Sequence, residues 1–399
     1  MSVSTKSKSK TPNTSNTTKK SKFSSSIPLP NVIKSNQEGD YLTFTIEKCN
    51  VSIINAIRRV ILSDIPVVVI DTFAKDSINI SKNTTLFNNE ILKQRLGCIP
   101  VHIKDVETPV DSLQLIIEKK NETNSFEYIT TKDFKIKDLK TEKMLPNDLV
   151  KQIFPPNPIT KSYILFSRLK FKISDDIPGE QLNLTCKFKV STAKESGMYN
   201  VVSTCAYKNS VDRAQQIDIW TEKEKELEEN GMKKDQVEFE RENWFLGEAN
   251  RIFKKDSFDF SLETIGIFTN MEIIHKACDI LINRLDELKK QTEGTNDKYD
   301  IIDFPIAMKN SFDIQLFNED YTVGKVIEYI LHNEYYRNQG LLDYVGFSKR
   351  HPHDEDSFIR VAFSEKNAET LTNRTNLIEI FKSCCDIGIR IFEEIKTFF

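Results

Sequence analysis

Residues 50–62 read Asn-Val-Ser-Ile-Ile-Asn-Ala-Ile-Arg-Arg-Val-Ile-Leu, and residues 95–100 read Arg-Leu-Gly-Cys-Ile-Pro. In the first segment the branched apolar residues recur at helical spacing, so they form one apolar stripe along a predicted helix. Ser52 is a suitable N-cap, because its hydroxyl can accept a hydrogen bond from a backbone N–H of the first turn. Pro66 marks the end of the helical segment soon after Leu62. The first segment is therefore predicted to be an amphipathic helix.

The polar side of this helix carries an asparagine and two arginines. An arginine pair on a helix surface is usually just a solvated face, and the helix alone would favour that interpretation. The polar turn at residues 83–90 and the segment at residues 95–100 change it. Helix, polar turn and Arg-Leu-Gly-Cys-Ile-Pro, in this order, resemble the assembly domain of the alpha-type subunit of multisubunit RNA polymerases. Its representatives are the third subunit in eukaryotes, a D-like counterpart in archaea and alpha in bacteria.

The resemblance implies a protein that helps to build a transcription enzyme without catalysing its chemistry. In this family the helix and the Arg-Leu-Gly-x-Ile-Pro segment form the dimerisation face and the surface that binds the two large catalytic subunits. Arginine suits such a surface, because its planar guanidinium pairs with carboxylates or carbonyls even when it is partly desolvated. The corresponding interface residues of this sequence are Asn55, Arg58, Arg59, Glu90, Arg95, Gly97 and Pro100.

The composition is that of an ordinary soluble protein with two or three domains, since 39% of the 399 residues are hydrophobic and 29% are charged. No apolar run has the length of a membrane span, and the N-terminus lacks the apolar core of a signal peptide. The seven cysteines include no Cys-x-x-Cys pair. We therefore expect neither a disulfide framework nor a zinc ribbon, and we predict an intracellular protein in a reducing compartment.

Residues 1–26 contain six lysines and no acidic residue, so the rest of the chain has 50 basic against 59 acidic side chains. The folded part is thus no obvious free-standing nucleic-acid binder, because such domains usually carry a basic excess. The tail is rich in Ser, Thr, Lys and Asn, which predicts disorder. A flexible solvating tail is the favoured interpretation, and the alternatives are weak nucleic-acid contact and a nuclear-import signal.

Alternating apolar residues predict a half-buried strand over residues 41–46. Residues 106–249 contain further strand-like segments, such as 182–190, and resemble the smaller inserted domain of the same subunits. The predicted fold is therefore of the α+β class, an alpha-type dimerisation fold with an inserted β-rich domain. The dimerisation domain is discontinuous and comprises residues 30–105 and 250–290.

In eukaryotic and some archaeal relatives the insert carries four cysteines that bind zinc or an iron–sulfur cluster. Here only Cys186 and Cys205 fall in the insert, without ligand spacing, so we predict no metal site there. His351 and His353 have no nearby cysteine or third histidine. A role of these two histidines in loop packing is therefore favoured over metal binding.

Residues 209–245 include a run of alternating charge at residues 221–229, Thr-Glu-Lys-Glu-Lys-Glu-Leu-Glu-Glu. Such a run is typical of a solvated helix, which is the favoured interpretation. An acidic docking arm is the alternative.

A second long helix is predicted to begin with a capping box formed by Thr269 and Glu272, followed by apolar residues at helical spacing. Residues 291–300 are predicted to be a linker. Residues 301–399 then resemble the smaller companion of the alpha-type subunit, which is the eleventh subunit in eukaryotes and its L-like counterpart in archaea. This part would form a second alpha-type dimerisation half.

The companion family carries the motif Glu-Asp-His-Thr-Leu-Gly-Asn, which resembles residues 319–325 of this chain. Two departures are a tyrosine at 321 in place of the histidine and a lysine at 325 in place of the asparagine. The resemblance implies interface roles for Glu319, Thr322 and Gly324.

Each half is predicted to have two helices with a broad apolar face, and packing one half on the other buries all four faces. Fusion raises the effective concentration of the two halves relative to separate chains. We therefore predict an intramolecular pseudo-heterodimer. The fusion of both partners in one chain resembles proteins of some nucleocytoplasmic large DNA viruses.

No catalytic motif is visible, because the chain lacks a Gly-rich phosphate loop, an Asp-x-Asp-Gly-Asp magnesium motif and a nucleophile elbow. We predict no catalytic residue, no metal and no cofactor in this chain, and the resemblance implies that catalytic magnesium lies in the largest subunit.

The predicted partners are the largest and second-largest polymerase subunits and the small subunits. DNA and RNA would be bound only through the complex, and no membrane is involved. A viral protein would occur in the virion and the host cytoplasm. The alternatives are a nucleic-acid-binding regulator that acts through the basic tail and a nucleotide-using enzyme of unrecognised type.

Overall fold

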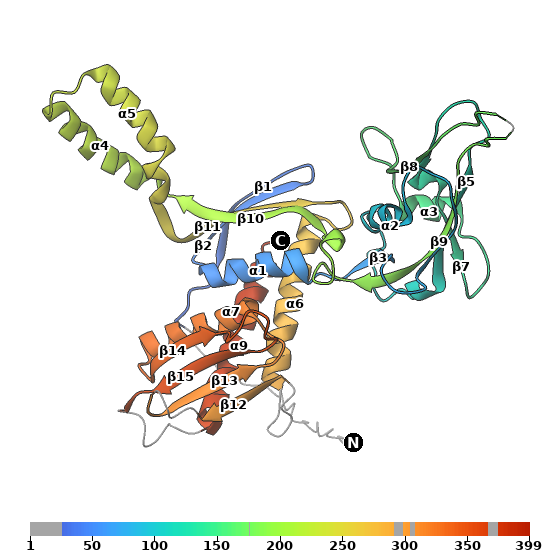
Figure 1. Ribbon diagram of the computed structural model, residues 1–399. Coiled ribbons are helices and arrows are strands. Elements are labelled where there is room, and N and C mark those ends of the chain that lie inside the picture. Colours follow the sequence, from blue (N-terminus) through green and yellow to red (C-terminus); the bar gives the residue numbers. More distant parts are fainter. Residues whose placement is uncertain (1–25, 175, 291–297, 304–307, 366–373) are drawn as a thin grey trace, which may run out of the picture.

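The computed structural model describes residues 26–174, 176–290, 298–303, 308–365 and 374–399. Within these ranges the chain combines helices with antiparallel sheets, in agreement with the predicted α+β class. Figure 1 shows one sheet above helix α1, a second sheet with its helices below it, and a separate β-rich part to one side. Nearly all of the predicted tail, and residues 291–297 of the predicted linker, lie outside the described residues.

The first sheet joins strands from distant parts of the sequence. Its order is β1 (Asn31–Glu38), β2 (Tyr41–Glu47), β11 (Phe253–Thr264) and β10 (Val202–Val211). The pairing of β2 with β11 places Phe44 opposite Phe260, and the two rings stack with centroids 5.0 Å apart. Strands that precede and follow the β-rich part thus share one sheet.

The C-terminal sheet has the order β12 (Tyr299–Asp303), β13 (Ser311–Leu316), β15 (Ser357–Phe363) and β14 (Leu342–Ser348). Helix α7 (Tyr321–Leu331) follows β13, and a π-helical segment at His332–Asn338 continues it. Strand β12 begins at Tyr299, so the last residues of the predicted linker belong to this sheet.

The two sheets repeat one topology. In each sheet a helix follows the second strand, α1 (Val51–Ser63) in the first and α7 in the second. The last strand in sequence is inserted beside that second strand and leads into a long helix, α6 (Asn270–Lys290) or α9 (Arg374–Lys396). Corresponding helices pack on each other, α1 on α7 and α6 on α9.

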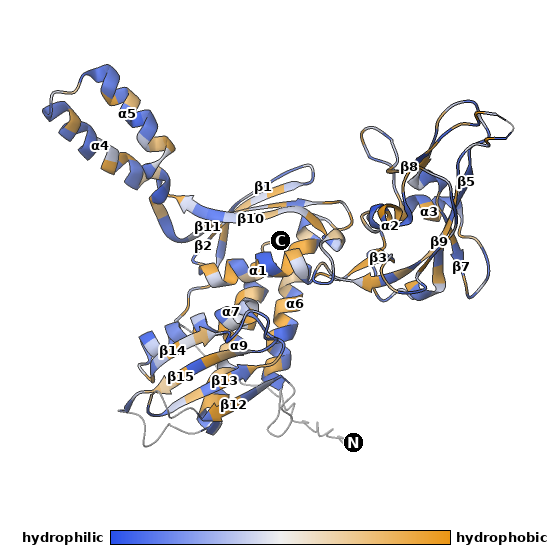
Figure 2. Ribbon diagram, in the orientation of Figure 1, coloured by the Kyte–Doolittle hydropathy of each residue, from blue (hydrophilic) through white to orange (hydrophobic). Residues whose placement is uncertain are grey.

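One hydrophobic core runs through both sheets and all four helices. The helices bury their apolar stripes in it, for example with Ile57, Leu285, Ile327 and Phe381, each at most 3% exposed. Figure 2 shows apolar and polar segments alternating along these helices, as expected for amphipathic helices. Burial of large apolar side chains contributes about 1.5–3 kcal/mol each. The shared core therefore stabilises the contact between the first half, which is the β1–β2–β11–β10 sheet with α1 and α6, and the second half, which is the β12–β13–β15–β14 sheet with α7 and α9.

Helices α6 and α9 run antiparallel and are joined by two ion pairs. Lys289 Nζ lies 2.5 Å from Asp386 Oδ1, and Lys396 Nζ lies 2.6 Å from Asp279 Oδ1. These side chains are partly exposed, so each pair contributes at most about 1 kcal/mol and mainly fixes the register of the helices.

The β-rich part has a separate hydrophobic core. Its larger sheet contains β3 (Val67–Asp71), β9 (Gln181–Ser191), β5 (Leu113–Lys120) and β7 (Lys135–Asp138), with β4 (Ile78–Asn83) also paired to β9. Strands β6 (Glu127–Thr130) and β8 (Leu165–Leu169) form a second, smaller sheet. Helices α2 (Asn89–Gly97) and α3 (Asn147–Ile153) belong to the same part.

The sheets divide the chain at residues that differ from the predicted domain boundaries. Strands β3 and β4 lie before residue 106, yet they pair with β9 in the sheet of the β-rich part. Strand β10 lies within the predicted insert of residues 106–249, yet it pairs with β11 in the first sheet. Pairing between distant strands decides this division, and no local pattern in the sequence records it.

The starts of the two long helices of the first half test the capping predictions. Asn50, and not Ser52, caps α1, because the Asn50 side chain accepts a hydrogen bond of 2.9 Å from the Ser52 amide. The capping box of α6 is confirmed. The Thr269 amide donates to Glu272 Oε2 at 2.8 Å, and the Glu272 amide donates to Thr269 Oγ1 at 3.3 Å.

The predicted charged helix at residues 221–229 is the C-terminal part of α4 (Arg213–Glu229). Helix α4 forms a helical hairpin with α5 (Lys234–Leu246), inserted between β10 and β11. Figure 1 shows it projecting away from the first sheet. Among the described residues, no helix has the length and apolarity needed to cross a membrane.

Candidate subunit interface

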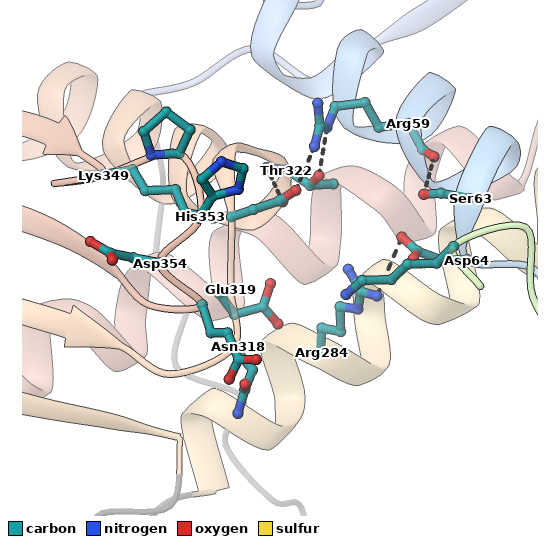
Figure 3. A pocket seen from close by; sticks show the side chains of 14 residues that line it. Arg59, Ser63, Asp64, Arg284, Asn318, Glu319, Thr322, Lys349, His353 and Asp354 are labelled. Atoms are coloured by element: carbon teal, nitrogen blue, oxygen red, sulfur yellow. Dashed lines mark hydrogen bonds and ion pairs between the residues drawn. The ribbon is translucent and has the colours of Figure 1, made fainter. Parts of the chain in front are cut away.

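A cleft of about 540 Å³ lies where the two halves meet (Figure 3). Its walls come from the end of α1 and from α6 in the first half, and from the turn before α7 and the loop at residues 349–355 in the second. Three of the predicted interface residues line this cleft: Arg59 of the first motif, and Glu319 and Thr322 of the companion motif.

Arg59 connects the two halves directly. Its Nε donates a hydrogen bond of 2.8 Å to Thr322 Oγ1, and its guanidinium forms an ion pair with Asp320. Asp320 is the N-cap of α7, since its carboxylate accepts a hydrogen bond of 2.8 Å from the Thr322 amide. Burial tends to raise the pKa of Asp320, but the bonds from Thr322 and the charge of Arg59 outweigh burial, and the pKa is lowered. The carboxylate is therefore charged at neutral pH.

A second ion pair lies deeper in the cleft and was not predicted from the sequence. The carboxylate of Asp64, the C-cap of α1, forms an ion pair with Arg284 of α6 at 3.3 Å. Figure 3 shows the Arg284 side chain extending from α6 toward Asp64. This contact joins two helices of the first half that are more than 200 residues apart in sequence, so no spacing rule could have found it.

Glu319 is an acidic group of the cleft whose surroundings oppose ionisation. Burial raises its pKa to about 7, and the neighbouring carboxylates of Asp320 and Asp64 add to the shift. Arg284 and Lys194 oppose the shift only in part, because Arg284 is already paired with Asp64. Glu319 therefore takes up or releases a proton near neutral pH.

Replacement of Glu319 by glutamine is expected to stabilise the protein at pH 8 and to have no effect below pH 4.5. A carboxyl whose folded-state pKa is raised from 4.5 to about 7 favours folding while protonated, and this contribution is lost as pH rises through 7. Glutamine removes the charged form, so the expected gain in free energy of unfolding at pH 8 is about 1–3 kcal/mol. Denaturant unfolding from pH 4 to 8 would measure it.

The matched control for this prediction is Glu355→Gln, which changes an exposed carboxylate at the rim of the same cleft. It is expected to leave the pH dependence of stability unchanged. A Glu319→Gln variant whose stability follows that of the natural protein at every pH would contradict the assignment.

Gly324 lies in the second turn of α7, against β14. A Cβ atom at this position would overlap the ring of Phe347. The Phe347 amide donates a hydrogen bond of 2.9 Å to Glu328 Oε1, and Lys325 forms an ion pair of 2.6 Å with the same carboxylate. The absence of a side chain at Gly324 therefore allows the Phe347 ring, on β14, to pack directly on the backbone of α7.

Asn55 and Arg58 form a pair on the half-buried side of α1. Arg58 donates through Nε at 3.1 Å and through a terminal nitrogen at 2.9 Å, both to Asn55 Oδ1. Both residues lie within one helical turn of Arg59, but neither lines the cleft. Arg58 thus bonds to a neutral side chain of its own helix, whereas Arg59 pairs with Asp320 of the second half.

The remaining predicted interface residues lie on α2 and directly after it, in the β-rich part. Arg95 donates to the backbone oxygens of Phe166 at 2.8 Å and Leu165 at 2.9 Å, so its guanidinium holds α2 to β8. Gly97 is buried, and a Cβ there would press on the Met198 sulfur. The apolar residues of this segment and those of α1 enter different cores.

Two further positions of this segment remain on or near the surface. Glu90 is exposed in the first turn of α2, where its charge is favourable at the helix N-terminus. Pro100 is half-buried just after the helix.

Possible metal ligands are dispersed in the part of the chain that the structure describes. No group of three or more His, Cys, Asp or Glu side chains is arranged to hold a metal ion there. The rings of His351 and His353 lie 5.2 Å apart in an exposed loop. Burial raises the pKa of the Cys186 and Cys205 thiols to about 12, which disfavours the thiolate form that binds metals.

Comparison with known proteins relates the chain to RNA polymerase subunits. The family described as the RNA polymerase Rpb3/Rpb11 dimerisation domain matches residues 43–285. The DNA-directed RNA polymerase subunit Rpo3 of Methanosphaera stadtmanae is 25% identical over 288 residues, which cover 63% of this chain and 94% of that protein. Subunit RPAC1 of the human DNA-directed RNA polymerases I and III is 24% identical over 292 residues, covering 62% of this chain and 81% of RPAC1.

Proposed function

Since this chain belongs to the RNA polymerase Rpb3/Rpb11 dimerisation family, we propose that it is the assembly platform of a multisubunit DNA-directed RNA polymerase. It is an alpha-type subunit, similar to Rpo3 and RPAC1. Its role in RNA synthesis is to hold the largest and second-largest subunits, together with small subunits, in the right arrangement. The chemistry, with its magnesium, belongs to the largest subunit.

The repeated topology is the observation that carries the proposal. Two sheets of the same strand order, each with two helices in the same places, meet through their corresponding helices, α1 on α7 and α6 on α9. Contact between equivalent surfaces is the arrangement expected of a two-fold dimer. We therefore propose that residues 26–290 and 298–399 are the two partners of an internal pseudo-heterodimer.

Cleavage of the chain between the halves is expected to leave them associated. A protease site placed in residues 291–297 would cut between α6 and β12, while the shared core and the two α6–α9 ion pairs hold the pieces together. Size-exclusion chromatography of the cleaved protein should give one peak at the position of the intact chain. Two separate peaks under native conditions would refute the pseudo-heterodimer.

The proposed docking surface for the large subunits contains fewer of the arginines than the family resemblance implied. Arg59 pairs with Asp320 across the halves, and Arg95 binds the backbone of β8. The proposed docking surface therefore includes Arg58, whose guanidinium donates to the neutral Asn55 side chain, and the exposed Glu90.

Arg58→Glu is expected to reduce binding of the large subunits at least tenfold, because a reversed charge in an interface costs more than about 1.4 kcal/mol. Tagged protein isolated from its native source, with mass spectrometry of the bound chains, measures this. Arg337→Glu is the control, since Arg337 is exposed on the second half. Absence of large subunits even with the natural chain would overturn the proposed function.

We propose that residues 301–399 take the place of the separate eleventh-subunit-like chain, as in nucleocytoplasmic large DNA viruses, and that the protein acts in the virion and host cytoplasm. The high Asn, Lys, Ile and Phe content supports this, because it fits an A+T-rich genome.

A further inference from the structure

The α4–α5 hairpin is a projecting element that the assembly role does not explain. It leaves the first sheet after β10 and returns at β11 (Figure 1). Within the described residues, its substantial contacts are those between its own helices and the short turn at Glu248–Arg251. Most of its surface therefore faces away from the rest of the molecule.

A small core of its own holds the hairpin together. Trp220 of α4 and Trp244 of α5 are 3% and 6% exposed, with ring centroids 5.6 Å apart. Gln216 is fully buried, and its side-chain amide donates a hydrogen bond of 2.5 Å to the Ala249 carbonyl oxygen. These contacts use only the inner faces of the two helices.

The outer face of α5 carries apolar side chains that the fold does not need. Phe239 is 63% exposed and Leu246 is 80% exposed. They are seven residues apart and so share one face of the helix, roughly opposite the buried Val237 and Trp244. Neither the packing of the hairpin nor the solvation of its surface requires this stripe. An exposed apolar stripe bordered by polar residues is typical of an interaction surface.

The charge around the stripe restricts what can cover it. Residues 212–251 hold twelve acidic and seven basic side chains, so they supply more than half of the acidic excess outside the lysine-rich tail. Glu238 and Glu242 are four residues apart and lie next to Phe239, on one side of it along α5. A second copy of the hairpin would be repelled by this charge. The tail of residues 1–25 has the opposite charge, but Phe23 is its only aromatic residue and it offers no apolar stripe.

We propose that the outer face of α5 is a docking site for another polypeptide, which presents an apolar groove bordered by lysine or arginine side chains. Phe239 and Leu246 enter the groove, and Glu238 and Glu242 pair with the basic border. The charge pairs steer association and make it sensitive to salt, while the two apolar side chains supply most of the affinity.

Zero-length carbodiimide cross-linking of the complex that carries the full-length chain, isolated from its native source, tests this proposal. The reagent joins a carboxylate to a lysine amine only where the two are in contact. We expect Glu238 and Glu242 to be linked to lysines in one segment of another polypeptide. The yield should fall about tenfold or more in the variant with Phe239→Ser and Leu246→Ser, since loss of two interface anchors costs at least about 1.4 kcal/mol.

Two controls accompany the experiment. Ile217→Ser removes an exposed apolar side chain (58% exposed) from α4 instead of α5 and should leave the yield unchanged. Trp220 and Trp244 are the two tryptophans of the chain, so tryptophan fluorescence reports the folding of this hairpin alone. It should be the same in all variants.

Three results would overturn the proposal. These are links from Glu238 and Glu242 only to lysines of residues 1–25, links between two copies of the chain, or an equal yield in the double variant and the natural protein. The readout is the position of the link and not the identity of the partner. It therefore stands apart from the Arg58→Glu experiment, which can fail without affecting this one.

Discussion

Leu285→Ala is expected to lower the free energy of unfolding by about 2–5 kcal/mol, the range for removing a large aliphatic side chain from a packed core. Leu285 is 1% exposed on α6 and packs against α9 at Gly388, where helix backbone and side chain meet without an intervening Cβ. The cavity would open at the contact between the two halves. Urea unfolding of the intact chain measures the loss of stability.

The same substitution should also weaken the association of the halves. In protein cleaved within residues 291–297, the Leu285→Ala halves are expected to separate on dilution at concentrations where the natural halves remain together. Leu184→Ala is the matched control, because Leu184 is 2% exposed in the core of the β-rich part. It should cost similar stability without separating the halves, and separation in both variants would count against a shared core as the link.

Gly324→Ala is expected to destabilise the protein by about 1–3 kcal/mol, the usual cost of overpacking. Alanine normally stabilises a helix by about 0.8–1.0 kcal/mol relative to glycine. Here that gain is outweighed, because the new Cβ would overlap the Phe347 ring and push β14 away from α7. Thermal unfolding followed by circular dichroism would measure the change.

A second substitution separates the steric cause from other effects of Gly324→Ala. In the double variant Gly324→Ala with Phe347→Leu, a smaller side chain replaces the ring that the new Cβ would overlap. This variant should recover part of the lost stability, and a double-mutant cycle measures the coupling between the two positions. Gly197→Ala is the control, since a Cβ at Gly197 would meet no atom within 4 Å. A Gly324→Ala variant as stable as the natural chain would show that Phe347 moves aside at no cost.

Short-range patterns in the sequence were enough to predict the amphipathic helices and the capping box of α6. The apolar stripe of residues 50–62 and the capping box of Thr269 and Glu272 depend on side chains within one or two turns of each other. Such interactions repeat with the period of the helix, so they can be recognised without knowing the rest of the fold. The family resemblance used the same short segments.

The sheet that each strand joins, and the partner of each interface residue, could be read only from the folded chain. Strand β3 follows α1 directly in sequence but pairs with β9 in the β-rich part. Arg59 was predicted to be an interface residue, but its partners, Asp320 and Thr322 of the other half, lie more than 250 positions away. Arg95 binds the backbone of β8.

The physical reason is the range of the interactions. A side chain's partner, its exposure and the pKa of a group such as Glu319 depend on elements that approach from distant parts of the chain. The projecting hairpin illustrates the same limit. Its charge pattern predicted a solvated helix, whereas the exposure of Phe239 and Leu246 became visible only once the buried face of α5 was known.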